Sequence, residues 1–312
     1  MTITKTRMTI IHNPSTPLHL SQDLAVAIGM FDGVHLGHRA LIERVKDVAK
    51  ARHCPAALIT YDNHPSLALR PNEPTPLIYT SNQRLSLLEQ FGVDYILLFT
   101  FNHSFANQTA EQFLAHIKNI CPFSYLNMGY DGRLGKNRSG DEEHLKTLSK
   151  RFNFILEYMP AYSLDNEKVS STAIRDLIRA GDLNNASALL GRPYSIAGHV
   201  ITGKKLGRTI GFPTANLLVH NIVTPPPGVW AVDVIWEGHK RQAVANLGVA
   251  PTVNTLRELL LEVHIPHYDG DLYGKVLEVV FKRYLRPEMR FDGLPHLQAQ
   301  LKKDVHSAIT EL

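Results

Sequence analysis

A short turn rich in glycine and histidine constrains the fold of this chain more than any other feature. Residues 29–38 read Gly-Met-Phe-Asp-Gly-Val-His-Leu-Gly-His, after the apolar run Leu24–Ile28 and before the helical pattern of Arg39–Lys50. A glycine-rich turn from a buried strand into a helix directs backbone N–H groups and the positive helix end at a bound phosphate. His35 and His38 can donate hydrogen bonds to one anionic ligand. The turn predicts a nucleotide site, with two solvated histidines on a first helical turn as the simpler alternative.

A second stretch combines hydroxyl side chains with an arginine at helical spacing. Residues 169–175 read Val-Ser-Ser-Thr-Ala-Ile-Arg and open an amphipathic helix that runs to about Ala180 and ends at Gly181. Ser171 and Arg175 are four residues apart, so they share a face of that helix. Hydroxyls at a helix start and a guanidinium one turn later predict a second phosphate clamp. An ordinary capping motif with a surface arginine is the alternative.

Composition limits the remaining possibilities. The chain has 312 residues, enough for two domains of ordinary size, and 44% of them are hydrophobic. No apolar run reaches the length of a membrane span, and the N-terminus has no secretory pattern. Cys54 and Cys121 are the only cysteines and have no metal-like spacing. We expect a cytoplasmic protein that does not bind membranes and is a monomer or weak oligomer.

Charge argues against nucleic acid as a partner. The formal net charge is +4, and no basic tail or block of like charge occurs along the chain. Nucleic-acid-binding proteins usually carry a clustered basic patch or stripe. Small-molecule substrates are therefore the expected ligands.

The first part of the chain alternates strand-like with helix-like segments. The strand candidates are Leu24–Met30, Ala56–Tyr61, Tyr95–Thr100, Tyr125–Gly129 and Phe152–Tyr158. The helix candidates are Leu36–Lys50, Ser81–Phe91, Ala110–Lys118 and Asp141–Lys150. This alternation predicts a parallel α/β sheet of Rossmann-like type with helices on both faces. Ligands of such sheets bind beyond the carboxyl ends of the strands, where the histidine turn would lie.

After about Gly191 the pattern changes to short strands separated by turns. The candidates are Ser195–Thr202, Ala215–Val219, Val229–Trp236, Gln242–Gly248, Leu260–Pro266 and Val276–Tyr284, followed by a helix at Leu294–Ile309. Six such strands and a closing helix predict a small antiparallel β-barrel with a C-terminal helix. We expect two domains, residues 1–185 and 186–312.

A glycine-rich segment opens the second half. Residues 198–216 contain four glycines that let the backbone approach a polyanion, while Lys204, Lys205 and Arg208 add positive charge. Thr214 and Asn216 are two apart, so on a strand they face one side and offer hard oxygen ligands to Mg²⁺. A flexible hairpin with surface lysines is the alternative.

Both halves resemble one known family. The string G-x-F-D-G-x-H-x-G-H is similar to the adenylyltransferase half of bacterial bifunctional FAD synthetases, in which an S-S-T-x-x-R motif closes on the ATP phosphates. The string G-R-x-x-G-F-P-T-A-N resembles the riboflavin kinase signature, and the strand E-x-H at Glu262–His264 resembles the strand that carries the base of that kinase. The resemblance runs from about Ala25 to Val305.

The resemblance implies roles for individual residues. It implies catalytic roles for Glu262, which would accept the riboflavin 5′-hydroxyl proton, and for His35, His38 and Arg175. ATP phosphates in the adenylyltransferase half would contact Gly29, Phe31, Asp32, Gly33, His35, Gly37, His38, Ser170, Ser171, Thr172 and Arg175. ATP and flavin in the kinase half would contact Gly203, Lys204, Gly207, Arg208, Gly211, Phe212, Pro213, Thr214, Asn216, Glu262 and Arg286. Mg²⁺ would bind Thr214 and Asn216.

The first half also departs from the pattern of the family. Met30 stands where an asparagine is usual, Asn63 replaces a proline, and Gly132 and Leu134 replace two aromatic residues. The lost aromatic area would loosen a flavin or adenine pocket. The expected flavin or nucleotide contacts in this half are His64, Asn127, Asp131 and Arg138.

By resemblance, the chain phosphorylates riboflavin to FMN with ATP and then joins FMN to the AMP part of ATP, giving FAD and pyrophosphate. Two alternatives remain open at this point. One is a riboflavin kinase whose adenylyltransferase half is impaired, and the other is a flavin- or nucleotide-binding regulator without turnover.

Overall fold

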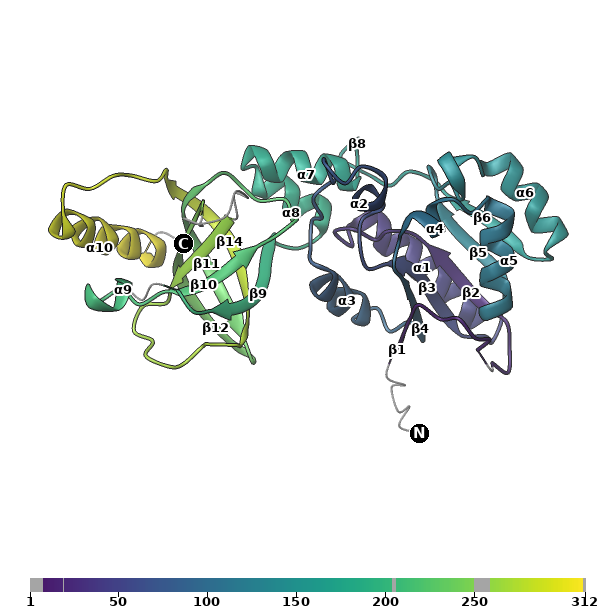
Figure 1. Cartoon of the computed structure of the whole chain (residues 1–312), viewed down its shortest axis with the longest axis horizontal. Coiled ribbons are helices and arrows are strands. Elements are labelled where there is room, and N and C mark those ends of the chain that lie inside the picture. The colour runs from purple at the N-terminus through teal and green to yellow at the C-terminus, as the bar shows by residue number, and fades with distance from the viewer. Residues whose placement is uncertain (1–7, 19, 204–205, 250–258, 311–312) are drawn as a thin grey trace. The chain divides into compact units, whose positions relative to one another are not determined.

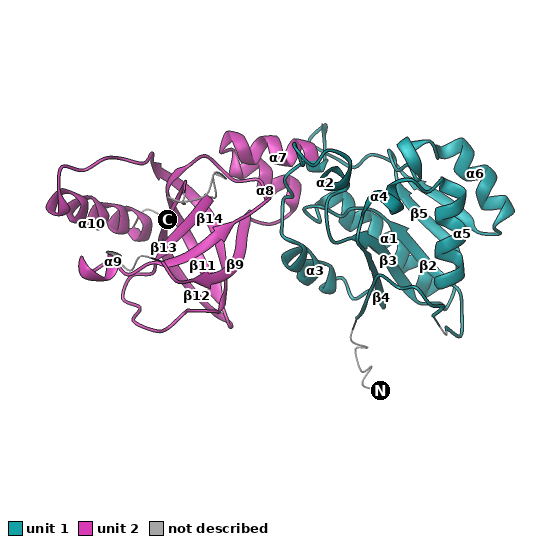
Figure 2. Cartoon of the chain, in the orientation of Figure 1, with its two compact units in different colours: residues 1–171 teal, residues 172–312 magenta. Residues whose placement is uncertain are grey.

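The chain divides into two compact units, residues 1–171 and 172–312 (Figure 2). The computed structural model describes residues 8–18, 20–203, 206–249 and 259–310. The boundary expected from the sequence, between residues 185 and 186, falls within helix α8 (Leu183–Leu190) and stays a prediction.

Unit 1 is built on a sheet of six parallel strands, in the order β1-β4-β3-β2-β5-β6 (Figure 1). The strands are β1 (Thr9–His12), β2 (Leu24–Ile28), β3 (Ala56–Tyr61), β4 (Tyr95–Phe99), β5 (Phe123–Gly129) and β6 (Ile155–Met159). The chain winds outward from β2 in one direction through β3 and β4, and in the other through β5 and β6. The switch point therefore lies at the carboxyl ends of β2 and β5, where ligands of such sheets bind.

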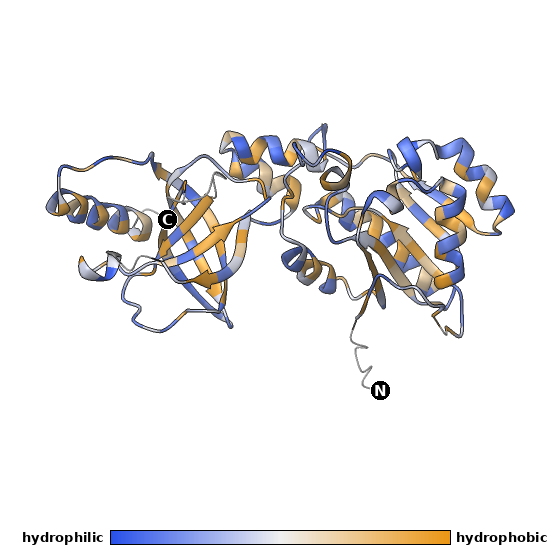
Figure 3. Ribbon diagram, viewed as in Figure 1, coloured by the Kyte–Doolittle hydropathy of each residue, from blue (hydrophilic) through white to orange (hydrophobic). Residues whose placement is uncertain are grey.

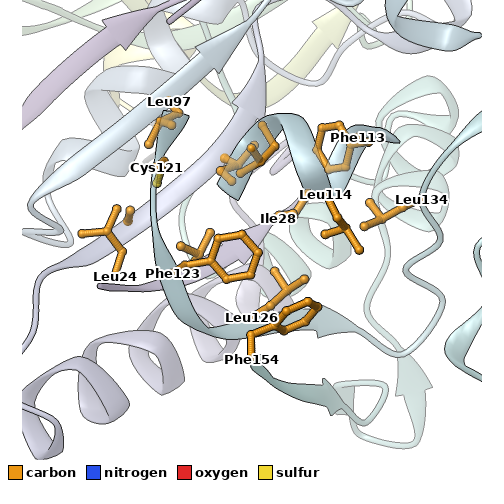
Figure 4. Packing of buried hydrophobic residues seen from close by; sticks show 14 of the residues in the cluster. Leu24, Ile28, Leu97, Phe113, Leu114, Cys121, Phe123, Leu126, Leu134 and Phe154 are labelled. Carbon is orange, nitrogen blue, oxygen red and sulfur yellow. The ribbon is translucent and has the colours of Figure 1, made fainter. Parts of the chain in front are cut away.

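Helices cover both faces of this sheet. They are α1 (Leu36–Ala51), α2 (Pro65–Leu69), α3 (Ser81–Glu89), α4 (His103–Ala106), α5 (Ala110–Ile120) and α6 (Glu142–Arg151), with a 3₁₀ turn, η1 (Lys136–Arg138), and a hairpin, β7 (Ser163–Leu164) and β8 (Glu167–Lys168). The central strand β2 is buried at every position. Leu24 and Ile28 pack with α5 and α6 on one face (Figure 4), and Ala25 and Ala27 pack with α1 and α3 on the other. This two-sided burial is why the strand reads as a continuous apolar run.

A bulge in β5 changes which side chains face each helix layer. Phe123 pairs with Leu24 and Tyr125 pairs with Ala25, so Ser124 is an extra residue. Phe123 and Tyr125 therefore pack on opposite faces although they are two residues apart.

Unit 2 contains a closed barrel of six antiparallel strands, in the order β10-β13-β12-β11-β14-β9. The strands are β9 (Ser195–Ile201), β10 (Ala215–Val219), β11 (Gly228–Trp236), β12 (His239–Val249), β13 (Leu259–His264) and β14 (Val276–Arg286). Helices α7 (Ser171–Ala180) and α8 precede the barrel, α9 (Leu206–Thr209) lies between β9 and β10, and α10 (Leu294–Thr310) ends the described chain. Apolar residues dominate the barrel strands, as Figure 3 shows.

The fold class expected from the sequence is confirmed in both halves, with local differences. The strand expected at Phe152–Tyr158 begins only at Ile155, because Phe152 and Phe154 close helix α6 through backbone bonds to Leu148 and Ser149. The weakly patterned N-terminal segment contributes a regular edge strand, β1, which pairs with β4.

Candidate active sites

The histidine turn follows β2 directly and is tightly folded. Phe31, Gly33 and Val34 have positive φ angles of 49°, 82° and 42°, and the Val34 N–H donates to the Phe31 carbonyl at 3.0 Å. A β-branched residue in this region is strained, and such strain occurs often at functional sites. The Asp32 side chain is buried and accepts the Ile78 N–H at 2.9 and 3.2 Å. Asp32 therefore fixes the turn itself, a role that the sequence did not indicate.

The two histidines lie together at the start of α1. Their rings stack with centroids 3.6 Å apart, and His38 meets Phe31 edge-on at 5.4 Å. His35 is the N-cap residue and accepts the His38 N–H through Nδ1 at 3.3 Å, which assigns its proton to Nε2. Histidine is not among the preferred N-cap residues, so capping alone does not explain its presence. A Cβ at Gly37 would lie 3.3 Å from the His35 ring, and the glycine thus makes room for it.

Ser171, from the hydroxyl and arginine motif, contacts this turn within unit 1. Ser171 Oγ donates to the Asp32 carbonyl at 2.9 Å. Ser171 begins helix α7, and Thr172 and Arg175 follow in its first turns, with Arg175 buried. The division between the compact units falls between Ser171 and Thr172. Ser170 directly precedes the helix.

A buried arginine that the sequence did not single out also supports this region. Arg84 on α3 is fully buried and donates to the carbonyls of Met30, at 3.1 Å, and of Tyr61. Burial lowers its pKa, and the nearby Asp32 and Asp62 carboxylates act in the opposite direction. Arg84 thus ties together the carboxyl ends of β2 and β3. The Met30 carbonyl is held whatever side chain stands there, and nothing in the sequence pattern marked Arg84.

The four further contacts expected in this half lie in different settings. His64 caps α2, and its Nδ1 accepts the Ser66 N–H at 3.1 Å. Asp131 is exposed beyond β5, and its carbonyl accepts from exposed Arg138 at 2.9 Å. Asn127 is fully buried on β5, and its amide has no hydrogen-bond partner among the described residues. Because Asn127 is inaccessible, a ligand would have to move its neighbours to reach it.

An aromatic cavity of about 330 Å³ opens at the same edge of the sheet, in unit 1. Its walls include Tyr61 at the end of β3, Pro65 after β3, Phe101 and Phe105 after β4, and Leu134 after β5. Aromatic and apolar walls around a volume of this size are typical of sites for small organic ligands.

The glycine-rich segment of unit 2 folds into a compact loop before β10. A Cβ at Gly207 would lie 2.2 Å from the Phe212 carbonyl oxygen, and Gly211 has a φ of 82°. The Phe212 N–H donates to the Gly207 carbonyl at 2.8 Å. Both glycines are thus required by the loop conformation. Lys204 and Lys205 lie outside the described residues.

Three barrel strands align polar side chains in one row. Asn216 on β10 is directly opposite Glu262 on β13, and Glu262 is directly opposite Asn246 on β12. Directly opposed residues of antiparallel strands point to the same face. The structure therefore brings together Asn216 and Glu262, which the sequence had singled out separately. Asn246 was missed, and its only sequence signal is a polar residue inside an apolar strand.

His264 holds the segment that carries Thr214. Its Nδ1 lies 2.8 Å from the Pro213 carbonyl, and its ring centroid lies 5.1 Å from that of Phe212. Since a carbonyl only accepts, Nδ1 carries the proton. Burial lowers the pKa of His264, which favours this neutral form. His264 is thus a positioning residue for Pro213 and Thr214.

The two expected arginine contacts differ in their surroundings. Arg208 is exposed, and its guanidinium lies 6.0 Å from the Tyr273 ring centre, in the lining of a small cavity that also includes Thr214 and Asp271. Arg286 forms a bidentate ion pair with buried Asp304 on α10, with its shortest contact at 2.7 Å. The Arg286 guanidinium thus fastens α10 to the barrel.

The donor set around Asn216 suits a magnesium ion that arrives with nucleotide phosphates. A Cβ at Gly203 would lie 2.3 Å from Nδ2 of buried Asn216, so only a glycine lets the backbone pack this closely against the amide. Among the described residues, no group of three or more His, Cys, Asp or Glu side chains could hold a metal ion. A hydroxyl and an amide oxygen beside one carboxylate fit a cation that keeps water and phosphate ligands.

In unit 1 the two histidines and Ser171 lie at one turn, and in unit 2 Asn216 and Glu262 lie opposite each other after a glycine-rich loop. Such arrangements are typical of transferases that act on nucleotides.

The comparisons with known proteins identify that class more closely. A family model described as FAD synthetase matches residues 18–173, and one described as riboflavin kinase matches residues 190–312. The bifunctional riboflavin kinase/FMN adenylyltransferase of Haemophilus influenzae is 38% identical over 301 residues, covering 96% of each chain. The enzyme of the same name from Bacillus subtilis is 34% identical over 290 residues, covering 91% of each chain. The chain belongs to the family of bifunctional riboflavin kinases/FMN adenylyltransferases.

A solved structure agrees on the fold. A crystal structure described as a macrolide-efflux protein from Streptococcus pneumoniae superposes with a TM-score of 0.82 at 31% sequence identity, over 96% of this chain and 99% of the other. Within the described part of this chain, no helix is both long and apolar enough to cross a membrane.

Proposed function

We infer that this chain makes FAD from riboflavin in two ATP-dependent steps, one in each unit. The barrel phosphorylates riboflavin to FMN, and the α/β unit adenylylates FMN to FAD with release of pyrophosphate. The observation that carries this inference is that one family model, FAD synthetase, matches residues 18–173 and a second, riboflavin kinase, matches residues 190–312.

In the barrel step, the riboflavin 5′-hydroxyl oxygen attacks the γ-phosphorus of ATP. The new P–O bond forms as the γ-phosphoanhydride bond breaks, ADP leaves, and the hydroxyl proton passes to the Glu262 carboxylate. Thr214 and Asn216 would hold Mg²⁺, which when bound supplies charge neutralisation for the phosphates. His264 supports this step by holding the Pro213 carbonyl, and with it the position of Thr214.

In the α/β step, a phosphate oxygen of FMN attacks the α-phosphorus of ATP and pyrophosphate leaves. The attacking oxygen is already anionic, so no general base is needed. Hydrogen-bond donors are needed instead. His35 and His38 at the start of α1 are two of the proposed donors, and the resemblance to the family adds Ser171 and Arg175.

The two faces of the sheet support this arrangement. The histidines belong to α1, which packs on one face, whereas the aromatic cavity includes Leu134 and Phe113 from the cluster on the other face. In-line transfer requires the attacking and leaving oxygens on opposite sides of phosphorus. We therefore assign the flavin ring to the aromatic cavity and pyrophosphate to the histidine turn.

One assay tests the assignment. Purified protein is incubated with riboflavin, ATP and Mg²⁺, and the flavins are separated by chromatography. We expect FMN to appear first and FAD to follow. FMN without FAD would contradict the adenylyltransferase step, and neither product would contradict both steps. The expected compartment and oligomeric state remain predictions.

A further inference from the structure

The aromatic surface of the cavity in unit 1 comes from an unexpected segment. Resemblance to the family places aromatic residues at positions 132 and 134, where this chain has glycine and leucine. A Cβ at Gly132 would lie 2.9 Å from both the Gly129 carbonyl oxygen and the Met128 methyl group. The conformation of this loop therefore excludes any larger side chain at position 132. Leu134 lines the cavity but has no aromatic face.

Three rings from two other segments form an aromatic corner instead. The ring centroid of Tyr61 lies 5.5 Å from the ring centroids of both Phe101 and Phe105, with interplanar angles of 86° and 83°. The centroids of Phe101 and Phe105 are 5.4 Å apart. All three side chains line the cavity and are only partly buried. Phe105 also contacts the buried rings of Phe99 and Phe113 at 5.7 and 5.5 Å. The corner is thus anchored in the core and keeps exposed aromatic surface toward the cavity.

Asn63 fixes the segment that supplies two of these rings. Its Nδ2 donates to the Phe101 carbonyl at 2.8 Å, and its Oδ1 accepts the Phe101 N–H at 2.8 Å. The last register pair of the two strands is Tyr61 with Phe99, so the Asn63 amide extends the ladder by one further pair. Proline, which the family usually has here, offers neither a donor nor a side-chain acceptor for these bonds.

Three neighbouring hydrogen bonds to Thr100 strengthen the same edge and do not involve the rings. Asp62 Oδ2 accepts the Thr100 hydroxyl at 2.7 Å. Asn13 Oδ1 accepts the Thr100 N–H at 2.8 Å, and Asn13 Nδ2 donates to Thr100 Oγ1 at 3.1 Å. Asn13 therefore makes two bonds to Thr100, as Asn63 does to Phe101, which provides a matched comparison.

We propose that Asn63 is a positioning residue for the flavin ring of FMN, because it holds Phe101 and Phe105 on the cavity wall in place of the aromatic side chains missing at positions 132 and 134. This inference rests on the proposed adenylyltransferase function. On this proposal, Asn63 in place of the usual proline compensates for the absence of aromatic side chains at positions 132 and 134. In this chain the aromatic lining of the cavity comes from Tyr61 and from the segment after β4 rather than from the loop after β5.

The closing experiment measures FAD formation from supplied FMN, with KM determined separately for FMN and for ATP. Asn63→Ala should raise KM for FMN about tenfold, and Phe105→Leu, which retains apolar packing, about threefold to tenfold. KM for ATP should stay within about twofold for both variants, because the histidine turn is unchanged. A role confined to folding would not separate the two KM values.

Two controls keep the result interpretable. Asn13→Gly removes the same number of bonds at the same sheet edge, suits the φ of 43° at this position, and should leave KM for FMN unchanged. The rate of riboflavin phosphorylation by the same variant proteins should also be unchanged. This rate shows whether unit 2 is correctly folded. The inference about Asn63 would be overturned if KM for FMN and KM for ATP changed equally, or if Phe105→Leu left KM for FMN unchanged. In either case, FAD formation by the unaltered chain would still support the adenylyltransferase function. Absence of FAD from the unaltered chain would overturn both.

Discussion

The two units position their chemistry in different ways. In unit 1 the candidate residues lie on a turn and at helix starts, and several of them are also the contacts that hold that turn, as with Asp32 and the Ile78 N–H. In unit 2 Asn216 and Glu262 lie opposite each other on paired strands, and the backbone ladder sets their separation. Substitutions in the turn should therefore affect folding and activity together, whereas those on the strands should affect activity alone.

The largest expected effect tests the strand-borne site. Glu262→Gln removes the proposed proton acceptor while keeping the size of the side chain, and should lower FMN formation by about 10²–10⁴-fold. FAD formation from supplied FMN and the unfolding temperature should be unchanged. Glu278→Gln, on β14 of the same barrel, is the matched control and should retain activity. Phosphorylation at an undiminished rate in Glu262→Gln would show that another group takes the proton.

The next effect tests the turn-borne site. His38→Ala should lower FAD formation from FMN by about 10²–10³-fold, since one donor to the transition state is lost. FMN formation from riboflavin should stay within about twofold. His116→Ala, at an exposed position of α5, serves as the control. Loss of both activities together would contradict the independence of the two sites.

A smaller effect tests whether folding and activity are coupled in the turn. Asp32→Asn weakens the charged acceptor of the Ile78 N–H and should lower the stability of unit 1 by about 1–3 kcal/mol. FAD formation should fall as well, although Asp32 is not among the proposed hydrogen-bond donors to the transition state. Thermal unfolding and both activities measure this, with exposed Asp47→Asn on α1 for comparison. Full stability with lost activity would instead indicate direct contact with substrate.

The smallest expected effect concerns pH in the barrel. Burial lowers the pKa of His264 below its ordinary value of 6.5, so the unfolded chain binds this proton more readily than the folded chain. The stabilisation is complete above pH 6.5 and is lost as pH falls below it. His264→Asn keeps a donor for the Pro213 carbonyl and should show a weaker decline in stability between pH 7 and 5. Identical pH profiles of the two proteins would contradict this account.

The sequence predicted well what depends on periodicity and local motifs. The alternation of apolar runs and helical patterns predicted the parallel sheet, and the short strands after Gly191 predicted the barrel. The spacing of Thr214 and Asn216 predicted a shared strand face, but Thr214 lies just before β10, so that prediction stays open. The opposition of Asn216 and Glu262 depends on strand register, which no local pattern encodes.

Residues that act through long-range contacts escaped prediction. Arg84 looks like an ordinary polar residue of an amphipathic helix, and only the fold buries it against the carbonyls of Met30 and Tyr61. Two of the four departures from the family pattern have a structural explanation. Asn63 gains two backbone bonds that a proline could not make, and Gly132 is required by its loop.

Helix α7 has a practical consequence for dissecting this enzyme. Ser171, the first residue of this helix, is the last residue of unit 1, whereas Arg175, four residues later, belongs to unit 2. A truncated gene ending at residue 171 would encode the parallel sheet but omit Arg175. The fragment would therefore lack one of the proposed hydrogen-bond donors of the adenylyltransferase site. Fragments meant to isolate adenylylation should therefore extend past Gly181, where the chain leaves the helix in a left-handed conformation with φ at 80°.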